Sequence, residues 1–224
     1  MPKEKKKIPR SKTTRNLFDK RKGVTVEFTS QALKEAVGEP ERNGAWLIYG
    51  REKHGKTQQA LRLAKDISQN EQVAYVSAEE GQDDSFIAAV QRAGITTADN
   101  IIWDEYLPID LLIEKYQRPR SANVIVLDNL TVYEDEITRT ELKKKVIDAF
   151  PNKLIIFVSH EERNEPFPAI AKQARKWAKV IFRVQGLMSS VTSRYSKGGT
   201  IRIDDETSEL IWGDDEIIKQ LKDE

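Results

Sequence analysis

A glycine-rich segment of the sequence combines residue types that suit phosphate binding. Residues 50–57 read GREKHGKT, which is the pattern G-x-x-x-x-G-K-[ST]. Glycines let such a loop turn so that successive backbone N–H groups point at phosphate oxygens, and a helix that begins at its end adds its positive dipole end. By chance the pattern occurs in roughly one chain of this length in a hundred. The spacing therefore predicts a phosphate-binding loop.

Two side chains at the end of this loop have chemistry of their own. We expect Lys56 to reach the β- and γ-phosphates of ATP and the Thr57 hydroxyl to bind Mg²⁺. The His54 side chain is at a variable position of the pattern and has no separate role assigned to it. The predicted cofactor-binding segment as a whole comprises Gly50, Arg51, Glu52, Lys53, His54, Gly55, Lys56, Thr57 and Gln58.

Carboxylates follow two further apolar runs of the sequence. The run NVIVLD ends at Asp128, roughly seventy residues after the loop, where a second contact to Mg²⁺ is needed. The run VAYVS is followed by Ala78 and then by Glu79 and Glu80. A nucleotide hydrolase needs a base that orients water against the γ-phosphate. We favour Glu79 as this base and expect its neighbour to be a bystander or a cap of the helix that begins near Asp83; the reverse assignment is the alternative.

A third polar pair, Ser159 and His160, ends the run LIIFVSH. Polar groups at a strand end beside a phosphate loop are able to contact the γ-phosphate and to pass that signal to the next loop. The other interpretation of His160 is a structural histidine, and the sequence does not decide between the two.

Short apolar runs alternate with segments of helical period between residues 45 and 159. The runs are AWLIY, VAYVS, NIIW, NVIVLD and LIIFVS. This pattern predicts an α/β fold in which a mainly parallel sheet is covered by helices on both faces. The last fifty residues differ, because KVIFRVQG, SSVTSRYS, TIRIDD and SELIWG are typical of antiparallel strands added at the C-terminal end. A strand at GVTVEF and a helix in TSQALKEAVG are expected before the first run.

The composition of the chain excludes several classes of protein. The chain has 224 residues, 33% of them charged, and a mean hydropathy of −0.60. No apolar run is long enough for a membrane span, and the chain contains no cysteine, which excludes disulfides and thiolate chemistry. We expect a cytoplasmic protein with no membrane partner. The four tryptophans lie in or beside apolar runs and are interpreted as core residues: Trp46, Trp103, Trp177 and Trp212.

Charge is distributed unevenly along the chain. Residues 1–22 hold ten Lys or Arg against two acidic residues, a net charge of +8, whereas the remainder holds 27 basic and 34 acidic residues. We predict a basic disordered arm at 1–22, a strand-helix lead-in at 23–43, an ATPase domain at 44–213 and an acidic tail at 214–224. The arm is either a nucleic-acid contact or a solubilising segment.

The motifs GREKHGKT, VAYVSAEEGQ, VIVLDN, FVSH and SRYSKGG occur in an order that resembles the RecA superfamily. The similarity covers about residues 44–200 and is greatest to the ATPase core of RadA-like proteins and DnaB-type helicases, with single-domain members from phages and mobile elements nearest in size. It implies ATP and Mg²⁺ as cofactors, a homo-oligomeric ring or filament, and work on single-stranded DNA in recombination, replication or repair. It also implies that Glu79 is the catalytic base and that Arg194 enters a neighbouring subunit's site. The other interpretation of Arg194 is a surface arginine paired with an acidic residue of the nearby segment IDDETSE.

Two features depart from the family pattern. Thr192 occupies a position where RadA-like proteins have lysine. The segments TVYEDEITR and EERNEPFPA, which correspond to DNA-binding loops in relatives, are rich in acidic residues, and this opposes phosphate contact. Basic residues are found instead in the arm, at Lys143 to Lys145, and at Arg175, Lys176 and Lys179. An ATP-gated assembly module for a protein partner is therefore a second hypothesis, and a small-molecule kinase is a third.

Overall fold

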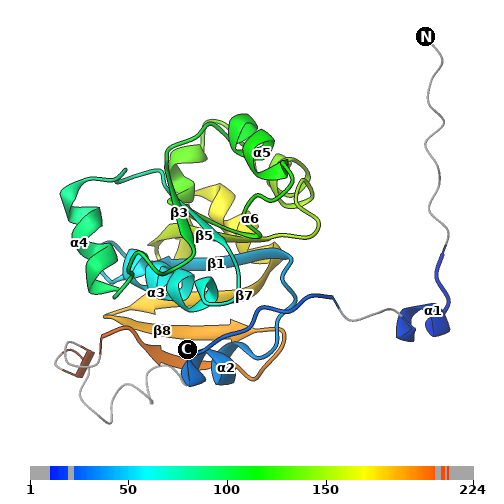
Figure 1. Cartoon of the computed structure of the whole chain (residues 1–224), viewed down its shortest axis with the longest axis horizontal. Coiled ribbons are helices and arrows are strands. Elements are labelled where there is room, and N and C mark those ends of the chain that lie inside the picture. The colour runs from blue at the N-terminus through cyan, green and yellow to red at the C-terminus, as the bar shows by residue number, and fades with distance from the viewer. Residues whose placement is uncertain (1–10, 20–22, 205–207, 210, 212–224) are drawn as a thin grey trace.

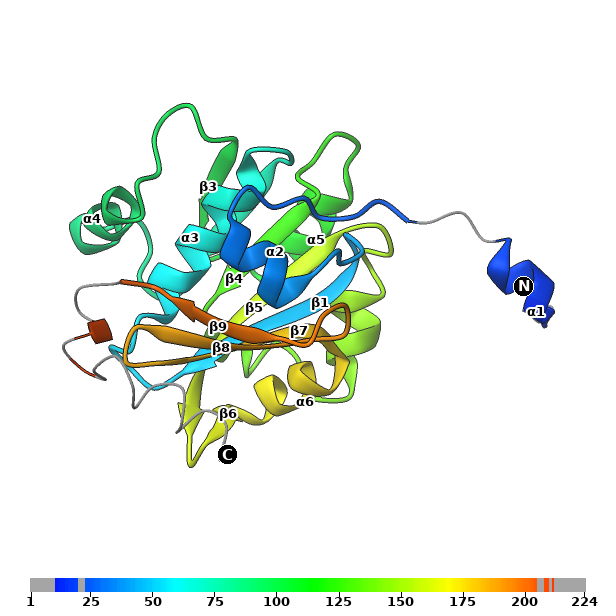
Figure 2. The same ribbon diagram turned by 90° about the horizontal axis from the view of Figure 1, so that it is seen from below.

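A mainly parallel sheet forms the centre of the molecule, with helices on both of its faces (Figures 1 and 2). The computed structural model describes residues 11–19, 23–204, 208, 209 and 211. The strands in this part of the chain are β1 (Gly44–Gly50), β2 (Val73–Ser77), β3 (Ile101–Glu105), β4 (Val124–Asp128), β5 (Leu154–Glu162), β6 (Glu165–Phe167), β7 (Ala178–Gln185), β8 (Met188–Ser193) and β9 (Gly199–Arg202).

The sheet order confirms the predicted α/β fold. Across the sheet the strands lie in the order β3-β2-β4-β5-β1-β7-β8-β9, and β6 pairs with β5. From β3 to β7 in this order all neighbours are parallel, whereas β8, β9 and β6 pair antiparallel. The antiparallel strands at the C-terminal end are therefore present as predicted.

Two layers of helices bury the two faces of the sheet. Alternate residues of β1 show this, since Trp46 and Ile48 belong to one core cluster and Leu47 and Tyr49 to the other. The first cluster includes residues of α2 (Gln31–Val37), α3 (Lys56–Ser68) and α4 (Asp84–Arg92). The second includes residues of α5 (Ile109–Gln117), the 3-10 turn η1 (Leu130–Tyr133), the π-helical segment η2 (Leu142–Ile147) and α6 (Ala169–Trp177).

The segment before β1, residues 23–43, is bound to α3 by hydrogen bonds. The buried Asp66 carboxylate accepts hydrogen bonds from the Thr29 N–H at 2.9 Å, the Thr29 hydroxyl at 2.6 Å and the Ser30 N–H at 2.8 Å. Ser30 is also the N-cap of α2. The predicted helix is thus present. The predicted strand GVTVEF instead forms a single β-bridge, between Thr25 and Glu41, and its neighbour there is the short segment 40–42.

Other predictions are corrected by the structure. Ser208, Glu209 and Ile211 are helical, so the strand expected at SELIWG is not found in its described residues. Trp46 is buried and Trp103 packs against the core, but Trp177 is 42% exposed because it ends α6 on the solvent side. Trp212 and the acidic tail at 214–224 lie outside the described residues.

The described part of the basic arm, residues 11–19, contains helix α1 (Thr14–Phe18). This differs from the predicted disorder, and its local cause is a capping box between Thr13 and Asn16. No residue of α1 is buried. None of the helices in the described part of the chain has the length and apolar character that a membrane span requires.

Candidate nucleotide-binding site

The loop between β1 and α3 depends on its two glycines for different reasons. A Cβ atom at Gly50 would lie 2.2 Å from the Val184 carbonyl oxygen of β7, so this residue permits close approach of two strands. Gly55 has φ +96, and a Cβ there would lie 2.6 Å from Cδ2 of Leu187. Helix α3 begins directly after it, at Lys56. The arrangement of strand, loop and helix is therefore the one that the sequence pattern requires.

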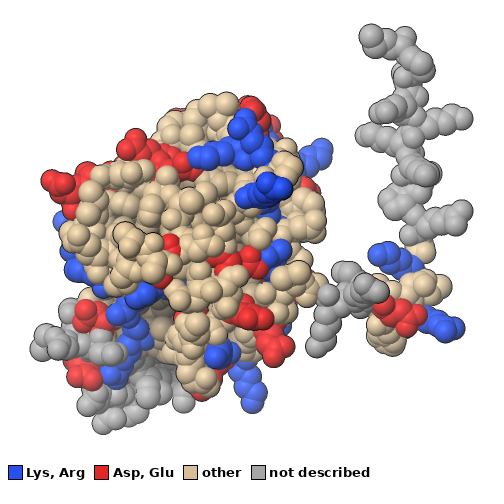
Figure 3. Space-filling view, viewed as in Figure 1, with Lys and Arg blue, Asp and Glu red and all other residues tan. Residues whose placement is uncertain are grey.

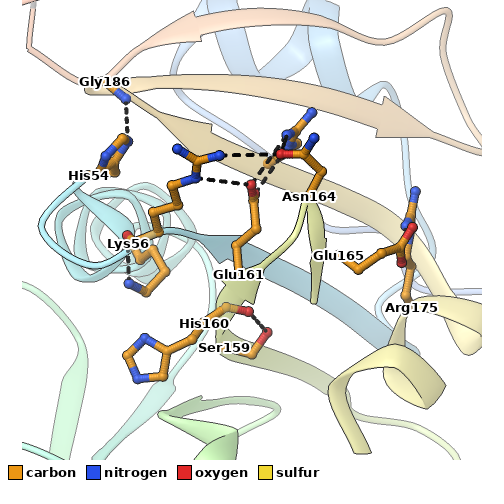
Figure 4. A network of polar contacts seen from close by, with 11 residues as sticks. His54, Lys56, Ser159, His160, Glu161, Asn164, Glu165, Arg175 and Gly186 are labelled. Atoms are coloured by element: carbon orange, nitrogen blue, oxygen red, sulfur yellow. Dashed lines mark hydrogen bonds and ion pairs between the residues drawn. The ribbon is translucent and has the colours of Figure 1, made fainter. Parts of the chain in front are cut away.

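Lys56 lies folded against its own loop. Its Nζ donates a hydrogen bond to the Arg51 carbonyl oxygen at 3.0 Å (Figure 4). The side chain is buried, and burial lowers the pKa of Lys56, whereas the carboxylates of Asp128 and Glu79 act in the opposite direction. The ammonium group is thus held beside two acidic groups in a site that can receive phosphate.

Asp128 ends β4 in a buried position next to Thr57. It accepts a hydrogen bond from the Tyr75 hydroxyl at 2.6 Å, and the Thr57 hydroxyl also hydrogen-bonds it. Burial raises the pKa of Asp128 to about 6, although these hydrogen bonds lower it. Oxygen ligands are those that Mg²⁺ prefers. Thr57 and Asp128 therefore fit a Mg²⁺ site, and Tyr75 orients the carboxylate.

Glu79 is held by two partners. The Asn129 side-chain amide donates to its Oε2 at 2.8 Å, and His160 Nε2 lies 3.4 Å from its Oε1. The hydrogen bond with His160 is the largest cause that lowers the pKa of Glu79. Burial and the adjacent Glu79 instead raise the pKa of Glu80. The cap of α4 is Asp83, which accepts from the Phe86 N–H at 2.8 Å. Of the two glutamates, Glu79 is therefore the one whose carboxylate is held by neighbouring side chains.

One cavity, of about 760 Å³, brings these groups together. The predicted site residues that line it are Glu52, Lys53, Gly55, Lys56, Thr57, Gln58, Glu79, Asp128 and His160. Sequence reasoning missed several lining residues, among them Asn129 and Leu187. Asn129 directly follows Asp128 and could have been noted from its position, whereas no local pattern marks Leu187.

Three predicted phosphate-loop residues are absent from the described lining of this cavity, and two of them make other contacts. His54 accepts from the Gly186 N–H at 3.1 Å, and burial lowers its pKa, which suits an acceptor. Arg51 points at the β5–β6 hairpin, with its Nε 3.8 Å from Glu161 Oε1. Gly50 is buried beside Val184 of β7, with which it pairs in the sheet. These contacts fix the loop to its neighbours.

Ser159 lies apart from the cavity. Along β5, Ile156 and Val158 belong to the core cluster on the α3 side, and Phe157 belongs to the other cluster. Ser159 shares the face of Phe157, is fully buried, and makes a long hydrogen bond of 3.5 Å to the His160 carbonyl oxygen (Figure 4). We therefore leave Ser159 out of the candidate site and retain His160.

Comparison with known proteins gives a structural likeness. No family model matches the sequence. No curated protein matches it significantly either. Among solved structures, the flagellar accessory protein FlaH from Methanocaldococcus jannaschii matches with a TM-score of 0.58 and 16% identity, covering 82% of this chain and 96% of FlaH. The ATPase domain of G40P matches with a TM-score of 0.52 and 16% identity, covering 71% and 80%. The chain therefore shares a RecA-like fold with these two structures.

In this RecA-like fold, Arg194 lies far from the cavity of its own chain. Near one end of β7, Val184 pairs with Gly50 at the start of the phosphate loop. Near the other end of β7, Val180 pairs with Ser193 of β8. Arg194 follows Ser193 and therefore lies at the strand end opposite the phosphate loop. Its side chain is exposed. The turn is fastened to α2, since the Ser193 hydroxyl donates to the Val37 carbonyl oxygen at 2.6 Å. One chain alone therefore does not bring Arg194 to the site.

The buried charge of Asp128 leads to a prediction about stability. Because the pKa rises from 3.8 to about 6 on folding, the ionised carboxylate is disfavoured in the folded state, and its cost is fully present above pH 6. Asp128→Asn should therefore raise the free energy of unfolding at pH 7 by on the order of 1 kcal/mol. Urea unfolding without nucleotide measures this. The gain should shrink near pH 4, and an equal gain at both pH values would contradict burial of the charge as its cause.

Proposed function

We propose that the chain is an oligomeric, Mg²⁺-dependent ATPase that acts in DNA recombination, replication or repair, on or near single-stranded DNA. The observation that supports this best is that Lys56, Thr57, Asp128 and Glu79 converge on one cavity beside a phosphate loop. A loop of this kind holds the phosphates through backbone N–H groups and a lysine. Hydrolysis also needs a base for the attacking water, and the Glu79 carboxylate next to this loop would serve as that base.

Each side chain has a role in the proposed reaction. Glu79 accepts a proton from the attacking water, and its contacts to Asn129 and His160 keep the carboxylate oriented. Lys56 moves from the Arg51 carbonyl to the phosphates and stabilises their charge. Mg²⁺ bound through Thr57 and Asp128 would neutralise charge on the β- and γ-oxygens. Arg194 from a neighbouring copy completes the site.

A protein-partner function is the second candidate. The likeness to a flagellar accessory protein supports it, as do the acidic segments 131–139 and 161–169. In this case ATP binding would control assembly without DNA. Measuring ATP turnover with and without single-stranded DNA separates the two, because clear stimulation that weakens with salt would exclude a pure assembly module. Phosphate release without an acceptor would exclude a small-molecule kinase.

Lys56→Ala tests the nucleotide site directly. We expect ATP binding to weaken about 10- to 100-fold, because a hydrogen bond to a charged group contributes about 1.5–3 kcal/mol. The fold should remain, since the loop conformation depends on backbone and glycines. Titration with a fluorescent ATP analogue measures the loss. Lys65→Ala, in the same helix α3 but outside the site, is the matched control. Binding at wild-type affinity by Lys56→Ala would overturn the assignment.

A further inference from the structure

The phosphate loop and the β7–β8 hairpin meet through two hydrogen bonds. His54 Nδ1 accepts from the Gly186 N–H at 3.1 Å (Figure 4), and the His54 carbonyl oxygen accepts from the Leu187 N–H at 3.2 Å. Gly186 and Leu187 are the two residues of the hairpin turn, because Gln185 pairs with Met188. One residue of the loop thus binds both residues of the turn, once through its side chain and once through its backbone.

Leu187 has an unusual backbone conformation for its residue type. Its φ is +59, in the left-handed region that Gly, Asn and Asp adopt at least cost in such a turn. Its side chain lines the nucleotide cavity and lies against Gly55, where a Cβ would come within 2.6 Å of Leu187 Cδ2. The Ile203 N–H donates to the Leu187 carbonyl oxygen at 2.8 Å. Strained residues cluster at ligand sites, so the position of this leucine is expected to matter to the ligand.

The His54 ring contacts the hairpin and lies outside the cavity lining. Lys53 and Gly55, on either side of it in the chain, both belong to the described lining, whereas His54 does not. A neutral imidazole carries one proton, and an Nδ1 atom that accepts a hydrogen bond leaves this proton on Nε2. A protonated ring would present an N–H to the Gly186 N–H, and these two donors would repel each other. The contact therefore requires the neutral ring with its proton on Nε2.

The surroundings of His54 favour this neutral form. Burial is the largest cause that lowers the pKa of His54 below its ordinary value, and the cations Arg51 and Lys56 of the phosphate loop act in the same direction. Glu161 of β5 acts in the opposite direction, but Arg183 of β7 binds this carboxylate at 3.1 Å. The two turn residues of the hairpin carry no charge. Basic and acidic side chains are mixed over the face drawn in Figure 3, so no field of one sign is expected from it.

We propose that His54 is a positioning residue, which in its neutral form holds the phosphate loop and Leu187 in the arrangement that binds nucleotide. Acid then weakens nucleotide binding, because protonation of the ring opens this contact and fewer molecules hold the binding-competent arrangement. The inference rests on the proposed function, in which the cavity holds ATP, and adds a control of binding by pH. A histidine that bound phosphate as a cation would have the opposite effect, since protonation would then strengthen binding.

Titration of the full chain with a fluorescent ATP analogue, between about pH 5.5 and about pH 7.5, tests the proposal. Wild-type affinity should be highest above about pH 6.5 and should fall as the pH drops below it, because the neutral ring is lost there. His54→Asn places an oxygen acceptor near the position of Nδ1 and does not titrate, so it should keep most of the affinity and lose less of it in acid. The other groups that titrate in this range, Asp128 and His160 among them, are common to both chains and cancel in the comparison.

His54→Gln is the matched variant. It carries the same amide one methylene further out, so its acceptor no longer meets the Gly186 N–H. We expect binding at about pH 7.5 to weaken about 2- to 10-fold, the effect of one neutral hydrogen bond, and KM to change more than turnover at saturation. Nitrogen-15 NMR of the full chain without nucleotide gives the tautomer directly, and His54→Asn identifies the His54 signals, since the chain has two histidines. The proton should be on Nε2.

Three results would each overturn the proposal: a His54 proton on Nδ1 at neutral pH, equal affinities of His54→Asn and His54→Gln, or wild-type binding that tightens in acid relative to His54→Asn. Weaker binding by the glutamine variant, together with an acid loss that the asparagine variant lacks, would support it. Turnover is measured separately, so a chain that binds nucleotide with this pH dependence and hydrolyses none contradicts the proposed function alone. Absence of nucleotide binding by the wild type at every pH would contradict both.

Discussion

Glu79→Gln is expected to bind ATP as the wild type does and to lose about 10²- to 10⁴-fold in turnover. Glutamine keeps the shape of the side chain and an oxygen that can accept from the Asn129 amide, which now lies 2.8 Å from Glu79 Oε2. It has no basic oxygen for the proton of water. Titration with a fluorescent ATP analogue and single-turnover phosphate release measure the two effects separately.

Glu80→Gln is the matched control for this experiment. It removes the neighbouring carboxylate, whose pKa is raised by burial and by Glu79, and which makes no hydrogen bond to Asn129 or His160 in the described structure. Turnover should stay within a few-fold of wild type. If Glu80→Gln instead loses turnover while Glu79→Gln retains it, the assignment of the base is wrong.

The parts of the fold that could be predicted are those encoded in short stretches. The central strands are buried on both faces, so runs such as NVIVLD are almost entirely apolar and are easily recognised. The loop at Gly50 to Thr57 is predictable because backbone geometry demands glycines at fixed positions. Asp128 followed from its place at the end of a strand.

Other features depend on contacts between distant segments. Asn129 and His160 come from different strand ends and meet only at Glu79, so neither one's role is visible locally. Ser159 was predicted beside His160, yet alternation along β5 turns it to the opposite face. Trp177 follows an apolar pattern in sequence, but only the packing of α6 shows that its ring is at the surface.

In the proposed function, Arg194 would make the site depend on a second copy. The residue follows β8 in a turn that α2 holds rigid, because the Ser193 hydroxyl donates to Val37 and the Ser196 hydroxyl donates to the Ala36 carbonyl oxygen at 2.5 Å. The Arg194 N–H donates to the Lys179 carbonyl oxygen at 3.0 Å, while its side chain is exposed. A rigid turn that projects an arginine away from its own cavity is suited to entering a neighbour's cavity.

Arg194→Ala should therefore remove most turnover, by about 10³- to 10⁵-fold, while each chain still binds ATP. Wild-type turnover should rise faster than linearly with protein concentration as copies associate. Phosphate release over a concentration series, with light scattering on the same samples, measures both. Lys197→Ala, in the same turn and also exposed, is the control and should leave turnover near wild type.

A mixture of Arg194→Ala and Glu79→Gln distinguishes a shared site from a surface arginine that only supports the fold. Each variant alone lacks one catalytic group at every site. In an equal mixture that assembles head to tail, about a quarter of the interfaces pair an intact Glu79 with an intact Arg194 from the neighbour. Turnover should recover to a corresponding fraction of wild type. If light scattering shows that the two variants co-assemble and no turnover returns, Arg194 does not act across the interface, and its loss must be explained within one chain.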